Sequence, residues 1–262
     1  MTFEQINWEV ADQVGWIRMD RPDKLNALTS RMAEEMIEAL DEAAGAGDVR
    51  CVVITGEGRA FCAGQDLTEF RERGLEQLDV AEHLRSGYNR MISAIVRLPK
   101  PVVAGVNGVA AGAGLSLACA CDVRIASEAA MFMQAFVKIG LVPDSGSTWL
   151  LPRIVGPARA LELSITGERV DAAEALRIGL VNRVVGAEQF PKELETYAQG
   201  MATGATRAIG VTKRVFAENA GTPLAEALER EALAQAELIG SPDFLEGVQA
   251  FLDKRPPRFE GR

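Results

Sequence analysis

The segment from Pro101 to Asp122, PVVAGVNGVAAGAGLSLACACD, constrains the fold more than any other part of the chain. Its β-branched run, Val102 to Val106, predicts a buried strand. The small residues from Asn107 to Gly114 permit backbone approaches that larger side chains would block, and Leu115 to Cys121 has helix composition. A strand, a glycine turn and a helix in this order leave the first helical N–H groups free to stabilise negative charge on a ligand. Close packing of helix on strand, without chemistry, is the equally open alternative.

The same order of strand, small-residue turn and helix occurs more than once. Arg50 to Thr55 predicts a buried strand, Gly56 to Asp66 a second turn rich in small residues, and a helix is expected to begin near Leu67. From about Pro191 onward, the sequence shows only the signals of helices. We therefore predict an α/β fold with a core over residues 1–190 and a helical region over residues 191–262.

Several helix ends carry capping signals. Thr29 or Ser30 is expected to cap the helix that follows it, and Thr222 and Ser241 each precede a proline that suits the first turn of a helix. The apolar segment 131–137 is compatible with an extended strand.

Charge and cysteine usage exclude several classes of protein. The net charge of −9 argues against binding to nucleic acid or to an anionic membrane, although a local basic patch for a phosphorylated ligand is compatible with it. The four cysteines have neither disulfide-like nor zinc-like spacing, and no apolar run reaches membrane-spanning length. The first ten residues, MTFEQINWEV, lack the basic and apolar regions of a secretion signal. We therefore expect a cytoplasmic protein with reduced thiols, no metal, and no nucleic-acid or membrane partner.

The chain contains one histidine, His83. A Ser-His-Asp triad would have to use it, and a histidine-rich metal site is excluded. His83 lies on a predicted helix over about residues 80–98, among apolar residues at helical spacing. The favoured interpretation is a histidine at the surface or boundary of the fold.

Four motifs in order resemble the enoyl-CoA hydratase/isomerase (crotonase) superfamily. They are RPDKLNAL at 21–28, FCAGQD at 61–66, NGVAAGAG at 107–114 and IGLVPDSGSTWLLPRIVG at 139–156. The resemblance implies a crotonase-like spiral of ββα units with a C-terminal α-helical trimerisation region, in a homotrimer or homohexamer. It also implies an acyl-CoA thioester as substrate. Coenzyme A is then part of the substrate, and no separate cofactor is expected.

The same resemblance implies roles for particular residues. The main-chain N–H groups of Gln65 and Ala113 match the pair that holds the thioester carbonyl oxygen in the family, a site known as the oxyanion hole. Further positions match those that contact the CoA or acyl part of the substrate: Lys24, Ala27, Leu28, Ala63, Gly64, Asp66, Leu67, Gly112, Phe136 and Leu141.

The departures from the family pattern are more informative than the matches. Family hydratases use two glutamates to position and activate water, and the matching positions here are Ser116 and Phe136. Neither can serve as a carboxylate base. Asp144 falls where several family isomerases carry a working aspartate, although a role as N-cap of the following helix is the structural alternative.

Among the subfamilies, the chain resembles the ring-1,2-epoxyphenylacetyl-CoA isomerases of phenylacetate degradation most closely. We therefore expect an acyl-CoA isomerase that uses Asp144 as acid and base, for a double-bond shift or for rearrangement of an aryl epoxide to an oxepin. An enoyl-CoA hydratase is the alternative enzyme. A dehalogenase would need a histidine near the aspartate, and the position of His83 in the sequence is displaced from the helical turn required for that role. A noncatalytic acyl-CoA-binding scaffold and an RNA-binding relative are alternatives of another class, and the acidic charge argues against the latter.

Overall fold

Two sheets organise the core of this computed structural model, which describes residues 3–73 and 79–262. The larger sheet has six strands in the order β1-β2-β3-β5-β7-β10. Its first two strands form an antiparallel hairpin, and the remaining pairs are parallel. Its strands are β1 Ile6–Ala11, β2 Val14–Met19, β3 Cys51–Gly56, β5 Val102–Val106, β7 Val123–Ser127 and β10 Arg183–Val185.

The smaller sheet has four strands of three residues each, in the order β4-β6-β8-β9. They are β4 Ala60–Cys62, β6 Val109–Ala111, β8 Met131–Met133 and β9 Arg169–Asp171. The chain passes from β3 to β4, from β5 to β6 and from β7 to β8, and enters helical structure after each pair. This repeated order confirms the predicted α/β spiral of ββα units.

Helices cover both faces of the larger sheet. The first core helix, α1, begins after Thr29, whose side chain accepts a hydrogen bond from the Met32 N–H at 3.1 Å, as the capping signal predicts. The helices that precede the C-terminal region are η1 Pro22–Lys24, α1 Ser30–Gly45, α2 Leu67–Arg73, α3 Val80–His83, η3 Leu84–Tyr88, α4 Asn89–Arg97, α5 Ala113–Ala120, η4 Ala135–Ile139, α6 Ser147–Val155, α7 Pro157–Thr166, α8 Ala172–Arg177 and α9 Phe190–Ala202. Helix α5 buries all of its residues, as expected of a helix at the centre of the fold.

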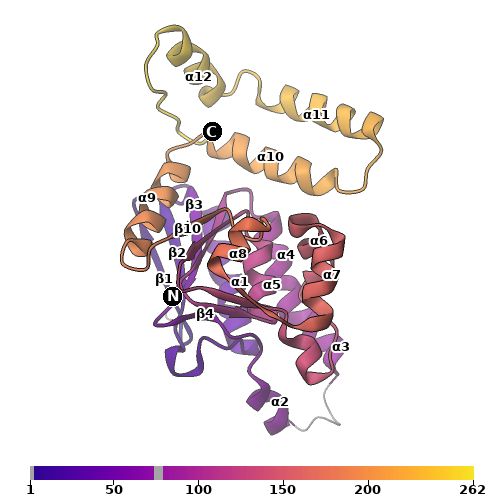
Figure 1. Cartoon of the computed structure of the whole chain (residues 1–262). Coiled ribbons are helices and arrows are strands. Elements are labelled where there is room, and N and C mark those ends of the chain that lie inside the picture. The colour runs from indigo at the N-terminus through magenta and orange to yellow at the C-terminus, as the bar shows by residue number, and fades with distance from the viewer. Residues whose placement is uncertain (1–2, 74–78) are drawn as a thin grey trace.

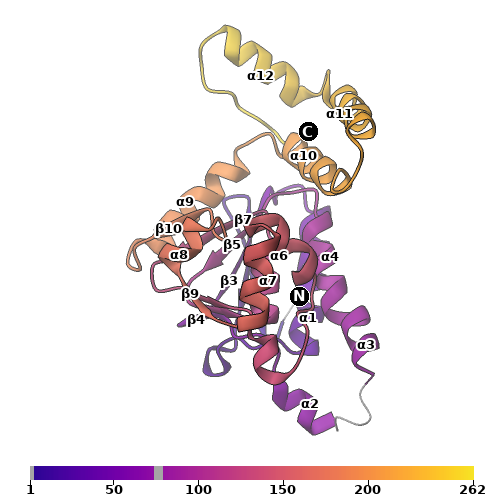
Figure 2. The ribbon, with the colours of Figure 1, turned by 45° about the vertical axis from the view of Figure 1, so that its right-hand side comes forward.

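The last three helices lie apart from the core at one end of the molecule (Figures 1 and 2). They are α10 Thr206–Glu218, α11 Leu224–Leu238 and α12 Pro242–Leu252. Polar contacts at Thr206 and Lys213 attach α10 to the core. Arg50 donates to the Thr206 hydroxyl at 3.0 Å, and Lys213 pairs with Asp122 at 2.9 Å. The division at residue 191 stays a prediction. Helix α9, which contains this residue, packs on the larger sheet through Phe190 and Leu194.

The structure corrects two local predictions. The segment 131–137 is not extended throughout, because β8 ends at Met133 and the 3-10 helix η4 follows, closed by Gly140 in the left-handed region. Thr222 does not cap α11, because its hydroxyl donates to the Glu218 carbonyl at the end of α10. Ser241 does cap α12, accepting from the Phe244 N–H at 3.2 Å.

Within residues 3–73 and 79–262, no helix combines the length and the apolar character needed to cross a bilayer.

Candidate active site

Two glycine-containing turns meet where β4 and β6 end. Gly64 has a φ of +98°, and a Cβ atom there would lie 2.8 Å from the Ala111 carbonyl oxygen and 3.6 Å from the Ala113 nitrogen. A Cβ atom on Gly114 would lie 2.2 Å from the Cys62 carbonyl oxygen. Only glycine permits these approaches without displacing the backbone. The small residues therefore allow the turn after β4, which contains Gly64, to lie directly against the turn after β6, which contains Gly112 and Gly114.

Each segment presents a main-chain N–H beside this contact. The Leu28 N–H donates to Gly64 at 2.8 Å, and the Asp66 N–H donates to Leu28 at 2.8 Å, so the intervening N–H of Gln65 takes part in neither bond. Ala113 is the first residue of α5, and its N–H consequently has no intrahelical acceptor. The positive end of the α5 dipole lies behind it. The arrangement suits an anionic oxygen held by two amides.

Asp144 lies in the loop before α6, next to α5. Its main-chain oxygen accepts from the Ser116 hydroxyl at 3.1 Å and from the Ser147 N–H at 3.0 Å. Its carboxylate accepts from the Ser145 hydroxyl at 2.9 Å. Burial raises the pKa of Asp144 above its ordinary value, against smaller opposing effects of the Ser145 hydrogen bond and the charge of His83.

Asp144 does not cap the following helix, so that structural alternative is wrong. Helix α6 begins at Ser147, and its N-cap is Gly146, which makes no side-chain capping bond. Ser145 and Gly146 both adopt positive φ, at 51° and 77°. These conformations separate Asp144 from the helix start. A non-glycine residue in this region carries backbone strain of the kind that concentrates at functional sites.

Ser116 and Phe136 lie at the same site, and neither supplies a carboxylate. Ser116 is fully buried in α5 and bonds to the Asp144 main chain. The Phe136 ring lies 3.9 Å from the position that a Cβ atom of Gly112 would occupy. Gly112 in turn donates to the Met133 carbonyl at 2.9 Å, which ties the start of α5 to β8.

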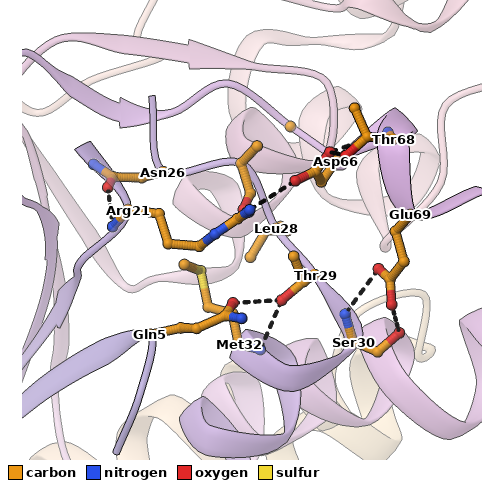
Figure 3. A network of polar contacts seen from close by, with 12 residues as sticks. Gln5, Arg21, Asn26, Leu28, Thr29, Ser30, Met32, Asp66, Thr68 and Glu69 are labelled. Carbon is orange, nitrogen blue, oxygen red and sulfur yellow. Dashed lines mark hydrogen bonds and ion pairs between the residues drawn. The ribbon is translucent and has the colours of Figure 1, made fainter. Parts of the chain in front are cut away.

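An ion pair that the sequence did not reveal joins the first motif to the second (Figure 3). Arg21 bonds to Asp66 at 2.8 Å and donates to the Ala27 carbonyl at 2.6 Å. Burial raises the pKa of Asp66, but hydrogen bonds from Thr68 and Arg21 outweigh it and hold the pKa below its ordinary value. The pair fixes the loop with Ala27 and Leu28 against the turn that carries Gln65. Nothing in the spacing of two residues so far apart in the sequence indicates this contact.

His83 also reaches the site. It is partly buried, which agrees with the predicted boundary position. Its Nε2 lies 3.2 Å from the side-chain amide nitrogen of Gln65, and its ring meets Tyr88 edge-on with centroids 5.2 Å apart. The contact with Gln65 and the effect of His83 on Asp144 were not predicted.

The remaining candidate residues lie around the two turns with different exposure. Leu28 is buried at its bridge to Gln65, and Ala63 donates to the Leu25 carbonyl at 3.0 Å. Lys24, Leu67 and Leu141 are exposed. In the part of the chain that the structure describes, no three His, Cys, Asp or Glu residues are grouped as metal ligands.

Known proteins share this sequence and fold over nearly their whole length. The sequence model of the enoyl-CoA hydratase/isomerase family matches residues 9–262. A "probable enoyl-CoA hydratase" of Rhodobacter capsulatus is 45% identical over 100% of both chains, and a 1,2-epoxyphenylacetyl-CoA isomerase of Escherichia coli is 38% identical over 94% of both. The crystal structure of an enoyl-CoA hydratase from Bacillus anthracis superimposes with a TM-score of 0.93 at 34% identity, covering 99% of this chain and 100% of that one. The family match over residues 9–262, with relatives and a fold matched at such identity and coverage, places this chain in the enoyl-CoA hydratase/isomerase family.

Proposed function

We propose that this protein is an acyl-CoA isomerase with Asp144 as its acid and base. The observation that carries the proposal is the set of side chains around Asp144. Ser116 and Phe136 occupy the positions where, by family resemblance, hydratases carry glutamates, and neither can activate water. Isomerisation needs one group that removes a proton and returns it. A partly buried aspartate whose main chain bonds to α5, the helix that Ala113 begins, meets that need.

The proposed reaction begins at the carbon next to the thioester carbonyl. Its C–H bond breaks, Asp144 takes the proton, and the electron pair moves toward the carbonyl oxygen to form an enolate. The N–H groups of Gln65 and Ala113 stabilise that oxygen as its charge develops, and fixed donors of this kind lower the barrier. Asp144 then gives the proton to a different carbon as the double bond shifts. Burial raises the pKa of Asp144, which strengthens it as a base near neutral pH.

For the substrate, we place the CoA part against Lys24, Ala27 and Leu28, with Ala63 and Gly64 beside the pantetheine, followed by Asp66 and Leu67. The acyl group then lies toward Gly112, Phe136 and Leu141. The apolar side chains support an aromatic or aliphatic acyl group. Similarity to the E. coli isomerase supports the epoxide rearrangement. A double-bond shift from position 3 to position 2 is the other reaction that a single acid and base can perform.

We expect negligible addition of water to crotonyl-CoA. Ser116 and Phe136 leave no second carboxylate to hold and deprotonate a water molecule. The measurement is the product mass after incubation with crotonyl-CoA and, separately, with 3-hexenoyl-CoA. Isomerisation of the second compound leaves its mass unchanged, whereas hydration adds one water. Hydration of crotonyl-CoA at rates typical of enzymes, about 1 to 1000 per second, would support the hydratase alternative, and no turnover of a panel of acyl-CoAs would support a noncatalytic scaffold.

We also expect a homotrimer or homohexamer. The C-terminal helices expose large apolar side chains, and α11 buries no residue within one chain. The most exposed are Phe216, Leu224, Ile239, Phe251 and Leu252. An apolar surface of this extent on a soluble chain marks an interface. Light scattering should give three or six times the chain mass of 28.2 kDa, and a monomeric mass at micromolar concentration would contradict the expectation.

We place the enzyme in the cytoplasm, where its four buried free cysteines would stay reduced.

A further inference from the structure

The end of β8 contacts both halves of the candidate site. The Met133 carbonyl oxygen accepts from the Gly112 N–H at 2.9 Å, directly before Ala113, whose N–H is proposed to hold the thioester oxygen. The next residue, Gln134, donates from its side-chain amide to the Ser147 hydroxyl at 2.7 Å. Gln134 and Ser147 are each 1% exposed, so bulk water does not compete for this bond. Two successive residues therefore hold the start of α5 and the start of α6.

Ser147 in turn holds Asp144 through the main chain. Its N–H donates to the Asp144 carbonyl oxygen at 3.0 Å, and the Ser116 hydroxyl donates to the same oxygen at 3.1 Å. A carbonyl oxygen has two lone pairs, and two donors suffice to occupy both. This carbonyl group is bonded to the Cα atom that carries the side chain. The two donors consequently fix the point from which the Asp144 carboxylate extends.

These contacts close into a ring. The Ser116 N–H donates to the Gly112 carbonyl oxygen at 3.1 Å, in the first turn of α5. The ring runs through six residues in the order Gly112, Met133, Gln134, Ser147, Asp144 and Ser116, and returns to Gly112. Because the ring is closed, each contact in it limits how far Asp144 can move from the start of α5.

The loop that carries Asp144 depends on contacts outside itself for its shape. Residues 140–146 connect η4 to α6, and Ser145 and Gly146 both have positive φ. Conformations of this kind persist where the surrounding structure imposes them. Ser145 is 2% exposed and donates from its hydroxyl to the Asp144 carboxylate. The bond from Gln134 to Ser147 joins the end of this loop to the smaller sheet.

The Gln134 amide is poorly suited to a role in packing alone. In the part of the chain that the structure describes, no group donates a hydrogen bond to its buried Oε1 atom. A buried carbonyl oxygen without a donor lowers the free energy of unfolding, and an apolar side chain of similar length would avoid that penalty. What the amide contributes is therefore the bond that its nitrogen makes to Ser147.

We propose that Gln134 is a positioning residue for the isomerisation: through Ser147 it holds Asp144 in place relative to the N–H of Ala113. The inference rests on the proposed function, because it assumes that Asp144 performs the proton transfer. A base must lie within hydrogen-bond reach of the proton that it removes, and a misplacement of about 1 Å can lower the rate by about 100-fold. The proposed role acts on the place of Asp144 and requires no contact between Gln134 and the substrate.

The kinetic test uses Gln134→Met, because methionine is unbranched, similar in length and unable to donate. With 3-hexenoyl-CoA as substrate, kcat should fall by about 10-fold to 100-fold, whereas the Kd for a saturated acyl-CoA should not change. Ser147→Ala, which removes the other partner, should lower kcat to a similar extent. An unchanged kcat in Gln134→Met would overturn the inference.

Ser127→Ala is the matched control for the loss of a buried hydroxyl. Ser127 ends β7, is 3% exposed and accepts from the Ala129 N–H at 3.2 Å, outside the ring of contacts around Asp144. Its kcat should equal that of the parent. A loss in Ser127→Ala as large as that in Ser147→Ala would contradict a specific role for the ring.

The double variant Gln134→Met/Ser147→Ala separates positioning from stability. Each single substitution leaves one buried polar group without its partner and should lower the melting temperature. The double variant removes both groups, so its melting temperature should return toward that of the parent, while kcat stays as low as in the single variants. Recovery of kcat together with the melting temperature would overturn the inference, because the pair would then serve only to stabilise the fold.

The positioning role and the proposed function fail in different measurements. Isomerisation of 3-hexenoyl-CoA by Asp144→Asn at the parent's rate would overturn the proposed function. Full kcat in the Gln134 and Ser147 variants, with activity lost in Asp144→Asn, would overturn the positioning role alone.

Discussion

Asp144→Asn is expected to lose isomerase activity by about 100-fold to 10,000-fold, toward the upper end because neither Ser116 nor Phe136 can replace the carboxylate. Asparagine matches aspartate in size but cannot accept and return a proton at neutral pH. The N–H groups of Gln65 and Ala113 remain, so acyl-CoA should still bind. The measurement is the rate of conversion of 3-hexenoyl-CoA to the conjugated isomer, followed by its ultraviolet absorbance, together with the Kd for a saturated acyl-CoA.

The same substitution should not destabilise the fold. Burial raises the pKa of Asp144 in the folded state, so the folded protein binds this proton more tightly than the unfolded chain does. The free energy of unfolding is therefore highest at acid pH, where Asp144 is protonated, and falls as the pH rises and the group ionises. Asparagine carries no charge, and at neutral pH the variant should therefore unfold at the same temperature as the parent or at a higher one. Asp144 makes no helix cap whose loss would act in the opposite direction. A marked drop in melting temperature would show a structural role that the contacts of Asp144 do not explain.

Gly64→Ala is expected to lower kcat by about 100-fold to 1000-fold, the usual effect of removing one oxyanion donor. The added Cβ atom would lie 2.8 Å from the Ala111 carbonyl oxygen, and φ at this position is +98°. Relief of the clash must move the turn, and the Gln65 N–H would move with it. Gly64 closely follows β4, and Ala111 is the last residue of β6, which pairs with β4. Moving the turn should therefore disturb this pairing and also lower the free energy of unfolding.

Gly200→Ala is the matched control for that variant. Gly200 lies within α9, and a Cβ atom there would meet nothing within 4 Å. Alanine in a helix is favoured over glycine by roughly 0.5–1 kcal/mol, so this variant should keep full activity and equal or greater stability. Rates for Gly64→Ala equal to those of Gly200→Ala would contradict the role given to the Gln65 N–H.

The repeating order of the fold could be predicted from the sequence, because the central strands β3 and β5 are continuous apolar runs and the helices between strands show helical spacing. The strands of the smaller sheet could not, since three residues are too few to show alternation. They form where glycine permits close approach: a Cβ atom on Gly108 would lie 2.1 Å from the Arg59 carbonyl oxygen, beside the pairing of β4 and β6. The sequence of segment 131–137 is compatible with an extended strand for a related reason. Its apolar composition fits a 3-10 turn that buries Phe136 as well as a strand.

Within the site, the motifs identified the glycine turns and Asp144, whose places in the structure agree with a single site. The contacts of His83 could not be predicted, because a π-helical turn adds one residue to a helical turn. That extra residue rotates the positions before it by roughly 100° relative to a continuous α-helix. The predicted boundary position of His83 agrees with its partial burial. The Arg21–Asp66 pair depends on how two loops pack, for which the sequence carries no local signal.

Exchange of carbon-bound protons tests the central claim most directly. The parent and Asp144→Asn would each be incubated with 3-hexenoyl-CoA in deuterated water, and the mass of the recovered acyl-CoA would be followed, with thermal unfolding as the control for folding. Asp144 is partly exposed, so the proton that it takes can exchange with water before it is returned. Proton removal beside the thioester by Asp144 therefore predicts deuterium incorporation with the parent and almost none with the variant. Equal incorporation by an equally well folded Asp144→Asn would contradict the account, because another group would then be the base.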